Sequence, residues 1–537
     1  MSKPFTFASA FLTVFTCYGM VSAQAATAPD LSIPAAPLRL AQAGEAVSKA
    51  QLDRALQAYK AKKYDDAFAM ASDIIENNPE FNEGFAYYLR GLVQFEQGQA
   101  EAALKDFNEA LSISSSNPYY YYDRGRAYAN LQQYNKALAD YTVALSRSPR
   151  GLAKKAYPYN MRGLSYFYTR NYPAAIKDFE QALQISPRYA FAHYNLSRVY
   201  NSQQNYAVAL QSAQEAINLN DRYDAAYYQM AVALNGLGRY KAAVKAFDRA
   251  LDIYPDWSGF FFNERGLSKL ELGDYDGARA DFERALAKNK QDASATNNIG
   301  LSYYRQKRYL NALKYYEKAA DINPKFATAY YNQALVYKAL KKYPEALKSY
   351  TRVIELTPRD SNAYNNRGLV YAATKKYDEA LQDLLKAHEL NPRDKRALNN
   401  IGDIYRRQKA YGKALTYIQK ALVLDPDYTL AQDNLGMIYF GMKNYEKAAV
   451  AFQKTLELDP GRTVTRNDLG VAYRYLKQYD KAREVFESIL KKDPDNALAI
   501  ANIGRVERDL KNCEAARKAF EKACKLGNKS ACKLGCK

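Results

Sequence analysis

Residues that commonly build catalytic or metal sites are scarce in this chain. It has 537 residues but only two His, five Cys and one Trp. Neither His193 nor His388 stands near a Ser or Cys in a nucleophile pattern, and a zinc site needs several Cys or His ligands at short spacings. The composition therefore predicts a protein that is not an enzyme and that carries no cofactor and no metal.

Long apolar runs, glycine and proline are also scarce. After the first 25 residues, no apolar stretch is long enough to span a bilayer. The 25 Gly and 18 Pro are too few for a fibrous protein, and 48% hydrophobic residues are too many for a disordered chain. The sequence predicts a folded chain with no transmembrane segment once the N-terminal segment has been removed.

The N-terminus has the features of an export signal. Lys3 precedes apolar or small residues over 5–21, and Ala23 and Ala25 each end a small-x-small cleavage pattern. We predict a signal peptide over 1–25, followed by an extended Ala- and Pro-rich linker over 26–47. A membrane anchor is the alternative, but the apolar stretch is short and interrupted by Thr and Ser. The expected location is periplasmic or secreted.

The charge is unbalanced, with 77 Lys and Arg against 57 Asp and Glu, for a formal net charge of +20. Such a surface attracts anionic partners at close range without identifying them. Because the chain is expected to be exported, nucleic acid is not expected as its partner.

From about residue 48 the sequence repeats every 34 residues. A small residue recurs once in each period, as Gly300, Ala334, Gly368, Gly402, Gly436, Gly470 and Gly504. A proline closes most periods, as Pro324, Pro358, Pro392, Pro426, Pro460 and Pro494. Apolar residues recur at helical spacing on both sides of a short polar turn, so each period is expected to form two helices, the second ended by proline.

This pattern resembles the tetratricopeptide repeat (TPR) family. In residues 327–360 the family's small, aromatic and terminal positions are Ala334, Tyr337, Ala346, Tyr350 and Pro358. Numbering each unit so that the Gly is eighth gives fourteen units, which begin near residues 48, 84, 118, 156, 190, 224, 259, 293, 327, 361, 395, 429, 463 and 497. The resemblance implies an all-α fold, an α-solenoid superhelix of about fourteen helix-turn-helix units over residues 48–530.

The residue types within a unit suit close packing of its two helices. Small residues at positions 8, 20 and 27 let the helices approach, and rings at positions 11, 17 and 24 fill the remaining space. Most of the 49 Tyr are therefore expected in the core. Four extra residues at 152–155 and one near Ser258 interrupt the period, and we expect bends there.

The resemblance also implies a concave groove lined by positions 2, 5, 6, 9, 12 and 13 of each first helix. Position 6 is repeatedly asparagine, as Asn195, Asn298, Asn332, Asn366, Asn400, Asn434 and Asn502, with Asp468 interrupting the series. This resembles the asparagine ladder of O-linked N-acetylglucosamine transferases, in which each amide can hold the backbone of an extended peptide. The alternative is that these amides satisfy local backbone groups. No counterpart of the transferase's catalytic domain is present.

Aromatic and basic residues occupy other groove positions. Position 5 carries Tyr88, Tyr122, Tyr194, Tyr228 and Tyr331. Exposed rings there could stack on sugars or on peptide side chains, or the rings could pack between neighbouring helices. Positions 12 and 13 carry Arg305, Lys338, Arg406, Arg407 and Arg474. These could pair with acidic groups on a ligand or could simply be solvated.

Four cysteines lie within the last 25 residues, as Cys513, Cys524, Cys532 and Cys536. An even number of thiols in an exported chain implies disulfides, with three possible pairings. The spacing from Cys524 to Cys532 resembles that of cysteine-rich Sel1-like repeats, which favours the pairs Cys524–Cys532 and Cys513–Cys536 and a stapled cap over residues 513–537. A metal site is the alternative, but the spacing is not that of paired Cys-x-x-Cys motifs.

Taken together, the sequence indicates a non-enzymatic periplasmic TPR scaffold that binds a protein or an extended peptide in its groove, with acidic peptides among the candidates. The alternative is an accessory scaffold of polysaccharide export or envelope biogenesis that binds glycan, resembling TPR proteins that accompany polymer secretion. No three consecutive units supply the residues of the chaperone-tail carboxylate clamp known in the family.

Overall fold

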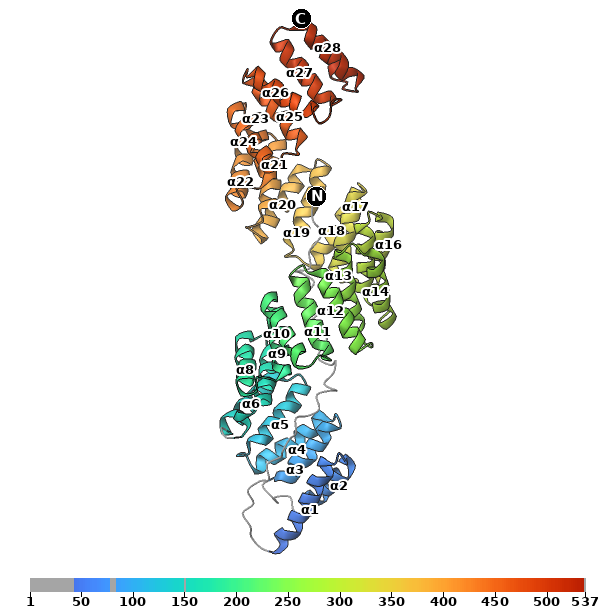
Figure 1. Cartoon of the computed structure of the whole chain (residues 1–537), viewed down its shortest axis with the longest axis vertical. Coiled ribbons are helices and arrows are strands. Elements are labelled where there is room, and N and C mark those ends of the chain that lie inside the picture. The colour runs from blue at the N-terminus through green and yellow to red at the C-terminus, as the bar shows by residue number, and fades with distance from the viewer. Residues whose placement is uncertain (1–42, 78–83, 149–150, 536–537) are drawn as a thin grey trace. The chain divides into compact units, whose positions relative to one another are not determined.

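The computed structural model describes residues 43–77, 84–148 and 151–535. Over these residues the chain forms 28 α-helices and two short 3₁₀ helices, η2 (Leu152–Lys154) and η3 (Ala531–Lys533). The α-helices are arranged in consecutive helix-turn-helix pairs, which confirms the predicted all-α repeat fold (Figure 1). The predicted signal peptide, and the linker up to residue 42, lie outside the described residues. The first helix begins at Ala43, slightly before the predicted start of the first unit.

Each hairpin is built from one first helix and one second helix. The first helices are α1 (Ala43–Lys60), α3 (Phe85–Glu96), α5 (Pro118–Asn130), α7 (Ala156–Tyr168), α9 (Ala190–Ser202), α11 (Asp224–Gly236), α13 (Gly259–Glu271), α15 (Ala293–Arg305), α17 (Ala327–Ala339), α19 (Ser361–Ala373), α21 (Lys395–Arg407), α23 (Thr429–Gly441), α25 (Thr463–Tyr475) and α27 (Ala497–Asp509). The second helices are α2 (Tyr64–Asn77), α4 (Ala100–Ile113), α6 (Tyr134–Arg147), α8 (Tyr172–Ile185), α10 (Tyr206–Leu219), α12 (Tyr240–Ile253), α14 (Tyr275–Lys288), α16 (Tyr309–Ile322), α18 (Tyr343–Leu356), α20 (Tyr377–Leu390), α22 (Tyr411–Leu424), α24 (Tyr445–Leu458), α26 (Tyr479–Leu490) and α28 (Cys513–Lys525).

Local signals set the ends of these helices, as the hairpin α19–α20 illustrates. The carboxylate of Asp360 caps α19 by accepting hydrogen bonds from the backbone N–H groups of Asn362 and Ala363 at 2.9 and 3.2 Å. The turn between the helices places Lys375 at a positive φ of 62°. Before this hairpin, α18 ends at Leu356, two residues ahead of Pro358, which has no N–H to continue the helix.

The two helices of a hairpin meet where glycine at position 8 faces the large residue at position 24. A Cβ built on Gly470 would lie 2.6 Å from the ring of Phe486, and one on Gly300 would lie 2.8 Å from the ring of Tyr316. No side chain fits at such distances without displacing the ring. The small residue at position 8 is therefore a packing requirement, as the sequence predicted.

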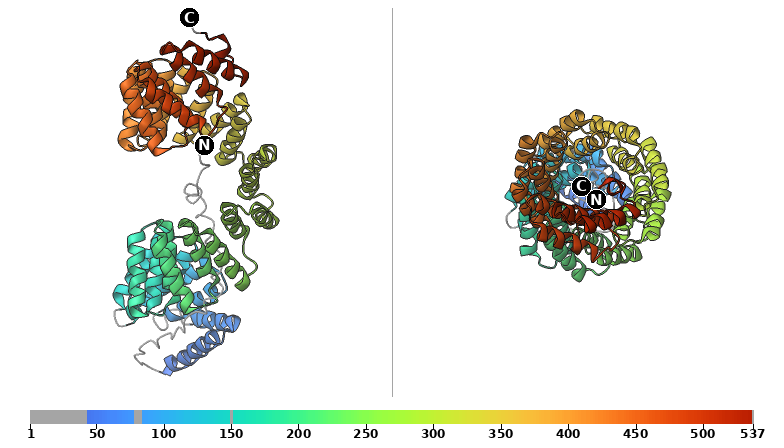
Figure 2. Two further views of the ribbon diagram at one scale, coloured as in Figure 1. Left: turned by 45° about the horizontal axis from the view of Figure 1, so that its top comes forward. Right: turned by 90° about the horizontal axis from the view of Figure 1, so that it is seen from above.

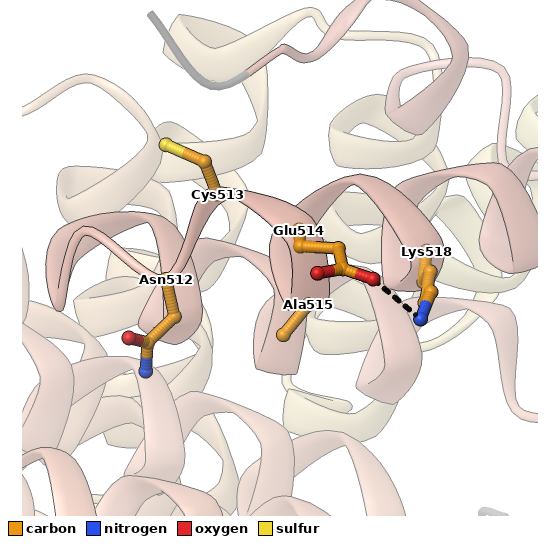
Figure 3. A pocket seen from close by; sticks show the side chains of 5 residues that line it. All are labelled: Asn512, Cys513, Glu514, Ala515 and Lys518. Atoms are coloured by element: carbon orange, nitrogen blue, oxygen red, sulfur yellow. Dashed lines mark ion pairs between the residues drawn. The ribbon is translucent and has the colours of Figure 1, made fainter.

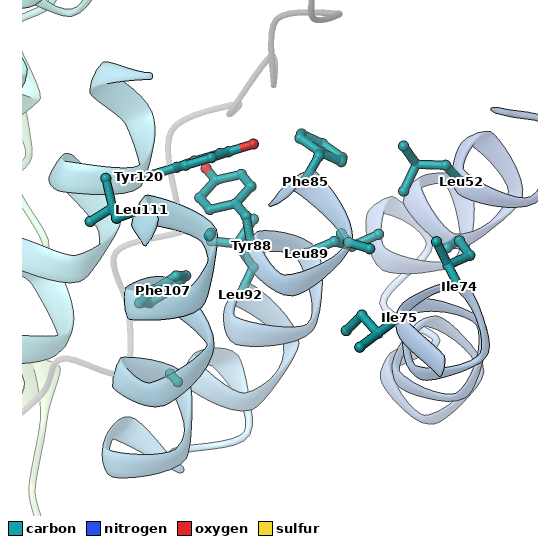
Figure 4. Packing of buried hydrophobic residues seen from close by; sticks show 14 of the residues in the cluster. Leu52, Ile74, Ile75, Phe85, Tyr88, Leu89, Leu92, Phe107, Leu111 and Tyr120 are labelled. Carbon is teal, nitrogen blue, oxygen red and sulfur yellow. The ribbon is translucent and has the colours of Figure 1, made fainter. Parts of the chain in front are cut away.

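The contacts within the chain divide its described residues into two compact units, one up to Val199 and one from Tyr200 onward, with the division inside α9. In the first unit, one large core joins α1 to α5 through buried residues such as Leu52, Phe85, Tyr88 and Phe107 (Figure 4). In the second unit, Figure 2 shows consecutive hairpins stacked in chain order from green to red. A series of smaller apolar clusters lies between these hairpins.

The two interruptions of the period are filled by apolar packing. The extra residues at 152–155 form η2, whose Leu152 is completely buried among Tyr122 and Tyr141. Beside the second interruption, Trp257 packs on Tyr228 and Phe261. Neither interruption coincides with the division between the two compact units.

The first helices line the inner side of each stack. First helices of consecutive hairpins contact one another, as α3 does with α5 and α21 with α23. Among the described residues, second helices of consecutive hairpins do not approach one another to the same extent. Because neighbouring hairpins approach more closely through their first helices than through their second helices, the stack curves toward the first helices. Within each compact unit the first helices therefore form an inner surface, called here the first-helix face.

Candidate functional site

The position-6 asparagines link neighbouring hairpins. Each donates a hydrogen bond from Nδ2 to the side chain of the residue 35 places earlier, which is position 5 of the preceding first helix. The pairs are Asn195–Asn160, Asn298–Asn263, Asn332–Asn297, Asn400–Asn365 and Asn434–Asn399, all at 2.9 Å, Asn366–Tyr331 at 2.8 Å and Asn502–Asn467 at 2.6 Å. We call this set of bonds the amide ladder.

The position-5 asparagines of the amide ladder were missed by the sequence analysis. The signal for them was present, because every position-6 asparagine has an Asn or a Tyr 35 residues before it. The expected alternative, in which the position-6 amides satisfy local backbone groups, holds only in part: Asn366 also donates to the carbonyl oxygen of Asn362 at 3.0 Å.

The amide ladder leaves hydrogen-bonding capacity on several rungs. A side-chain amide has two N–H donors. Among the described residues, Asn332 and Asn434 each use one donor, in the bond to the preceding hairpin. Asn332 is 9% exposed, whereas Asn434 is half-buried. The hydrogen bond to the preceding hairpin already fixes the orientation of such an amide. Its second N–H can therefore bind a ligand without a further loss of side-chain entropy.

Two acidic residues interrupt the amide ladder at position 6. Glu264 on α13 is buried, and burial raises the pKa of its carboxyl to about 7. Its Oε2 has no hydrogen-bond partner among the described residues. Asp468 on α25 has a pKa raised to about 6, first by burial and then by the neighbouring charge of Asp433. Both carboxyls are therefore poorly solvated in the ionised state.

The position-5 tyrosines mostly lie in the core. Tyr88 and Tyr122 are each 4% exposed and Tyr331 is 8% exposed. Tyr88 donates a hydrogen bond to the carboxylate of Asp123 at 2.7 Å and packs against Tyr120 with ring centroids 4.6 Å apart. Tyr194 and Tyr228 are half-buried. The packing alternative therefore describes Tyr88, Tyr122 and Tyr331, whose rings are not open for stacking.

Most of the basic residues at positions 12 and 13 are paired within the protein. Arg305 contacts Glu271 at 2.8 Å, Arg474 contacts Asp509 at 2.6 Å, and Arg407 contacts Asp403 at 2.8 Å. Arg406 contacts the same Asp403 carboxylate as Arg407, at 2.5 Å. Lys338 is different: it is half-buried, it has no ion pair among the described residues, and burial lowers its pKa.

The C-terminal end contains one of the expected disulfides. Cys524 at the end of α28 is bonded to Cys532 in η3, with Cα atoms 4.9 Å apart. Cys536 lies outside the described residues, so the Cys513–Cys536 pair stays a prediction. A hollow at the start of α28 is lined by Asn512, Cys513, Glu514, Ala515 and Lys518 (Figure 3). Its Glu514 and Lys518 pair with each other at 2.8 Å, so their charges are not directed at a ligand.

Within the described ranges, no group of three or more His, Cys, Asp or Glu side chains is placed to hold a metal ion. In the same part of the chain, no helix is both long and apolar enough to cross a membrane. His193 lies 3.3 Å from the carbonyl oxygen of Pro187, and burial lowers the pKa of His388.

Comparison with solved structures finds other helical-repeat proteins at low similarity. Yeast Tom70 is 16% identical, with 84% of this chain and 98% of Tom70 covered and a TM-score of 0.41. A chain of the APC/C hetero-tetramer Cut9–Hcn1 is 15% identical over 84% of this chain and 95% of that one, with a TM-score of 0.40. YrrB, a TPR protein with an unusual peptide-binding site, is 26% identical over 34% of this chain and 95% of that one, with a TM-score of 0.30. No curated protein sequence matches the chain.

Family profiles give a clearer result. Profiles described as tetratricopeptide repeat or TPR repeat match residues 91–132, 118–150, 160–225, 225–256, 263–325, 315–348, 334–375, 359–427, 394–461 and 439–503. These segments span well over half of the sequence and coincide with the hairpins of the structure. The chain belongs to the tetratricopeptide repeat family.

Proposed function

We propose that this chain is an exported, non-enzymatic scaffold that binds an extended polypeptide on its first-helix face. TPR proteins are scaffolds for protein–protein interaction, and profiles of the family match most of this chain. The observation that supports the site is the amide ladder, in which consecutive first helices carry oriented amides at a regular spacing, half-buried at Asn400 and Asn434 and buried at Asn332. An amide can donate to a peptide carbonyl and accept from a peptide N–H without regard to side-chain sequence.

The export part of this proposal rests on the sequence of residues 1–25 alone. Cell fractionation of the full-length protein tests it directly. We expect the protein in the periplasmic or secreted fraction, with a mature N-terminus near Ala25. Retention in the cytoplasm with an intact N-terminus would contradict export and leave the peptide-binding proposal standing.

The peptide-binding proposal is tested with two matched triple variants. The first replaces the position-6 asparagines Asn332, Asn400 and Asn434 with Ala. The second replaces their position-5 partners Asn297, Asn365 and Asn399 with Ala. Both variants lose the same three hydrogen bonds between hairpins, so both should lose similar stability, but only the first loses the amides proposed to contact a ligand.

We expect capture from a random peptide library to fall at least tenfold in the position-6 variant and by a much smaller factor in the position-5 variant, which keeps these amides but loses the bonds that orient them. Equal losses in both variants would show that the amide ladder is structural only. Unchanged capture in the position-6 variant would remove it from the mechanism.

Glycan binding is the second candidate, and it depended on exposed rings at position 5. The near-complete burial of Tyr88 and Tyr122 does not support it. Binding on a glycan array that is lost on replacement of the half-buried Tyr228 by Ala would restore this candidate.

A further inference from the structure

Three arginines on α25 and α27 have a single ion-paired carboxylate among them, that of Asp509. Arg474, on α25, contacts Asp509 with Nε 2.6 Å from Oδ2. Arg508, on α27, contacts the other oxygen of the same carboxylate at 3.9 Å. Arg505, one turn earlier on α27, has no ion pair with any carboxylate among the described residues. The group carries three positive charges and one negative charge.

Arg505 is held in place by the last rung of the amide ladder. Its Nη1 donates to Oδ1 of Asn502, and Nδ2 of Asn502 in turn donates to Oδ1 of Asn467 at 2.6 Å. The side chain is half-buried. Burial lowers the pKa of the Arg505 guanidinium, and the like charges of Arg474 and Arg508 lower it further. The guanidinium is therefore oriented but not neutralised.

The other carboxylates of this region are engaged elsewhere. Glu507 accepts hydrogen bonds from Arg483 of α26 at 2.7 and 3.1 Å and from Asn512 at 2.8 Å. Asp468, on α25, has no ion pair with these arginines among the described residues, and its pKa is raised by burial and by Asp433. No described carboxylate beyond Asp509 therefore compensates the three arginines.

The fold does not require an arginine at this place. Arg505 is at position 9 of its unit, and the same position carries Leu301, Leu335 and Leu369 in three consecutive earlier units. Arginine stands there in two other units, as Arg126 and Arg198, and bonds the position-6 side chain in the same way. Leucine packs there at no electrostatic cost, whereas a half-buried arginine among like charges is unfavourable without an anion. Local arrangements that cost stability are expected mainly at functional sites.

We propose that Arg474, Arg505 and Arg508 form an anion site that binds a carboxylate of a polypeptide lying along the amide ladder. The inference rests on the peptide-binding function proposed above. It adds that an acidic group of the bound chain is held at the part of the first-helix face formed by α25 and α27. A guanidinium offers two parallel N–H donors to the two oxygens of a carboxylate. The carboxylate belongs to an acidic side chain or to the C-terminus of the bound chain.

The test uses full-length mature protein and three synthetic probes. The probes are oligoglutamate with an amidated C-terminus, oligoglutamine with a free C-terminal carboxylate, and oligoglutamine amide, which has no carboxylate. Binding is measured by titration calorimetry for the wild type, Arg505→Leu and the control Arg517→Leu. Arg517 is exposed on the second helix α28, so the control removes the same charge away from the first-helix face.

We expect at least one carboxylate-bearing probe to bind the wild type and the Arg517→Leu variant, and to bind Arg505→Leu at least tenfold more weakly. Tight binding of the oligoglutamate amide assigns a side-chain carboxylate, and tight binding of the free-acid oligoglutamine assigns the C-terminus. The melting temperature of Arg505→Leu should equal or exceed that of the wild type, because the substitution relieves repulsion. A variant Arg505→Gln checks that the loss of charge, and not the new side chain, is responsible.

Several results would overturn the anion site. Equal weakening in Arg505→Leu and Arg517→Leu would indicate general charge attraction. A lower melting temperature of Arg505→Leu with unchanged affinity would assign the arginine a structural role. Oligoglutamine amide binding as tightly as the acidic probes would refute this site while leaving the peptide-binding proposal intact, and failure of all three probes to bind would refute both.

Discussion

At the scale of single residues, the turn between the two helices of each hairpin shows an unusual choice. Position 15 has a positive φ, which favours glycine, yet most units carry another residue there. The residues with φ between 57° and 66° are Lys62, Gln132, Arg170, Gln204, Lys307, Lys341, Lys375, Lys409, Lys443, Lys477 and Lys511. Glycine adopts this conformation without the Cβ repulsion that other L-residues experience.

Replacing Lys341 with Gly should therefore stabilise the protein by about 1 kcal/mol. Lys341 is exposed and has a φ of 59°, so the substitution removes strain and no described ion pair. The midpoint of urea unfolding measures the effect. Lys348→Gly, within α18, is the control and should destabilise by about 1 kcal/mol. A loss of stability in Lys341→Gly would mean that the lysine makes a contact worth more than the strain.

A second residue-scale prediction concerns Glu264. Its pKa is raised to about 7 by burial. The pKa of this carboxyl is higher in the folded protein than in the unfolded chain. The free energy of unfolding is therefore at its full value below the ordinary glutamate pKa, and it decreases as the pH rises through the folded-state pKa. The stability of the wild type should therefore fall between pH 5 and pH 8 by up to about 3 kcal/mol from this group.

Glu264→Gln should remove this fall and leave stability near pH 4 almost unchanged, because glutamine resembles the protonated acid. Melting temperatures recorded at several pH values test the prediction. The variant Glu283→Gln, in which an exposed carboxylate is removed, should follow the wild-type profile. If Glu264→Gln also followed that profile, the buried carboxyl would not be the titrating group.

Residue-scale features were partly predictable from the sequence. The Gly or Ala at position 8 could be predicted because the 34-residue period repeats it and close packing explains it. The hydrogen bond from Asn332 to Asn297 could not, because it connects two hairpins and depends on their relative rotation. The burial of Tyr122 could not be distinguished from exposure for the same reason, since position 5 lies at the edge between core and groove.

At the scale of elements, a two-pronged ion pair joins the two helices of five hairpins. Arginine at position 7 of the first helix donates from Nε and Nη2 to aspartate at position 23 of the second. The pairs are Arg90–Asp106, Arg124–Asp140, Arg162–Asp178, Arg265–Asp281 and Arg367–Asp383. From the second hairpin onward, the two residue types always occur together. Hairpins without the pair carry other combinations, such as Ile401 with Tyr417.

Replacing both residues of one pair together should cost little stability, whereas replacing only one of them should cost much more. The side chain of Asp383 is 6% exposed and that of Arg367 is 17% exposed. Asp383→Ala strands a largely buried guanidinium and should cost about 2–4 kcal/mol. The double substitution Arg367→Ile with Asp383→Tyr copies Ile401 and Tyr417 and should recover most of this loss.

Hydrogen exchange of α19 and α20 is the appropriate measurement, because a repeat protein unfolds locally and not as one unit. The single variants should exchange faster in these two helices, and the double variant should return toward the wild type. Equal destabilisation by the single and double variants would show that the sequence context of each hairpin, and not the ion pair, fixes the residue types.

At the scale of the whole molecule, the helical period predicted the architecture but not its division. Pro358 and its equivalents, the small position 8 and the helical spacing of apolar residues define each hairpin locally, so the hairpins could be predicted one by one. The division at residues 199 and 200 lies inside α9, where the period is uninterrupted. A local pattern within one period carries no information about such a division.

Because each hairpin contacts mainly its neighbours, stability should vary along the chain and the C-terminal end should depend on its disulfide. Replacing Cys524 and Cys532 with Ser removes a cross-link over a sequence separation of 8, which should cost about 2–3 kcal/mol. The bond holds η3, whose buried Ala531 packs in one cluster with Phe520 of α28. The loss should therefore appear in α27 and α28, where hydrogen exchange should accelerate more than tenfold, while α13 and α14 keep wild-type rates.

Mild reduction of the wild type should reproduce the pattern. Faster exchange in α13 as well would mean that the hairpins unfold together, which stacking through nearest-neighbour contacts does not allow.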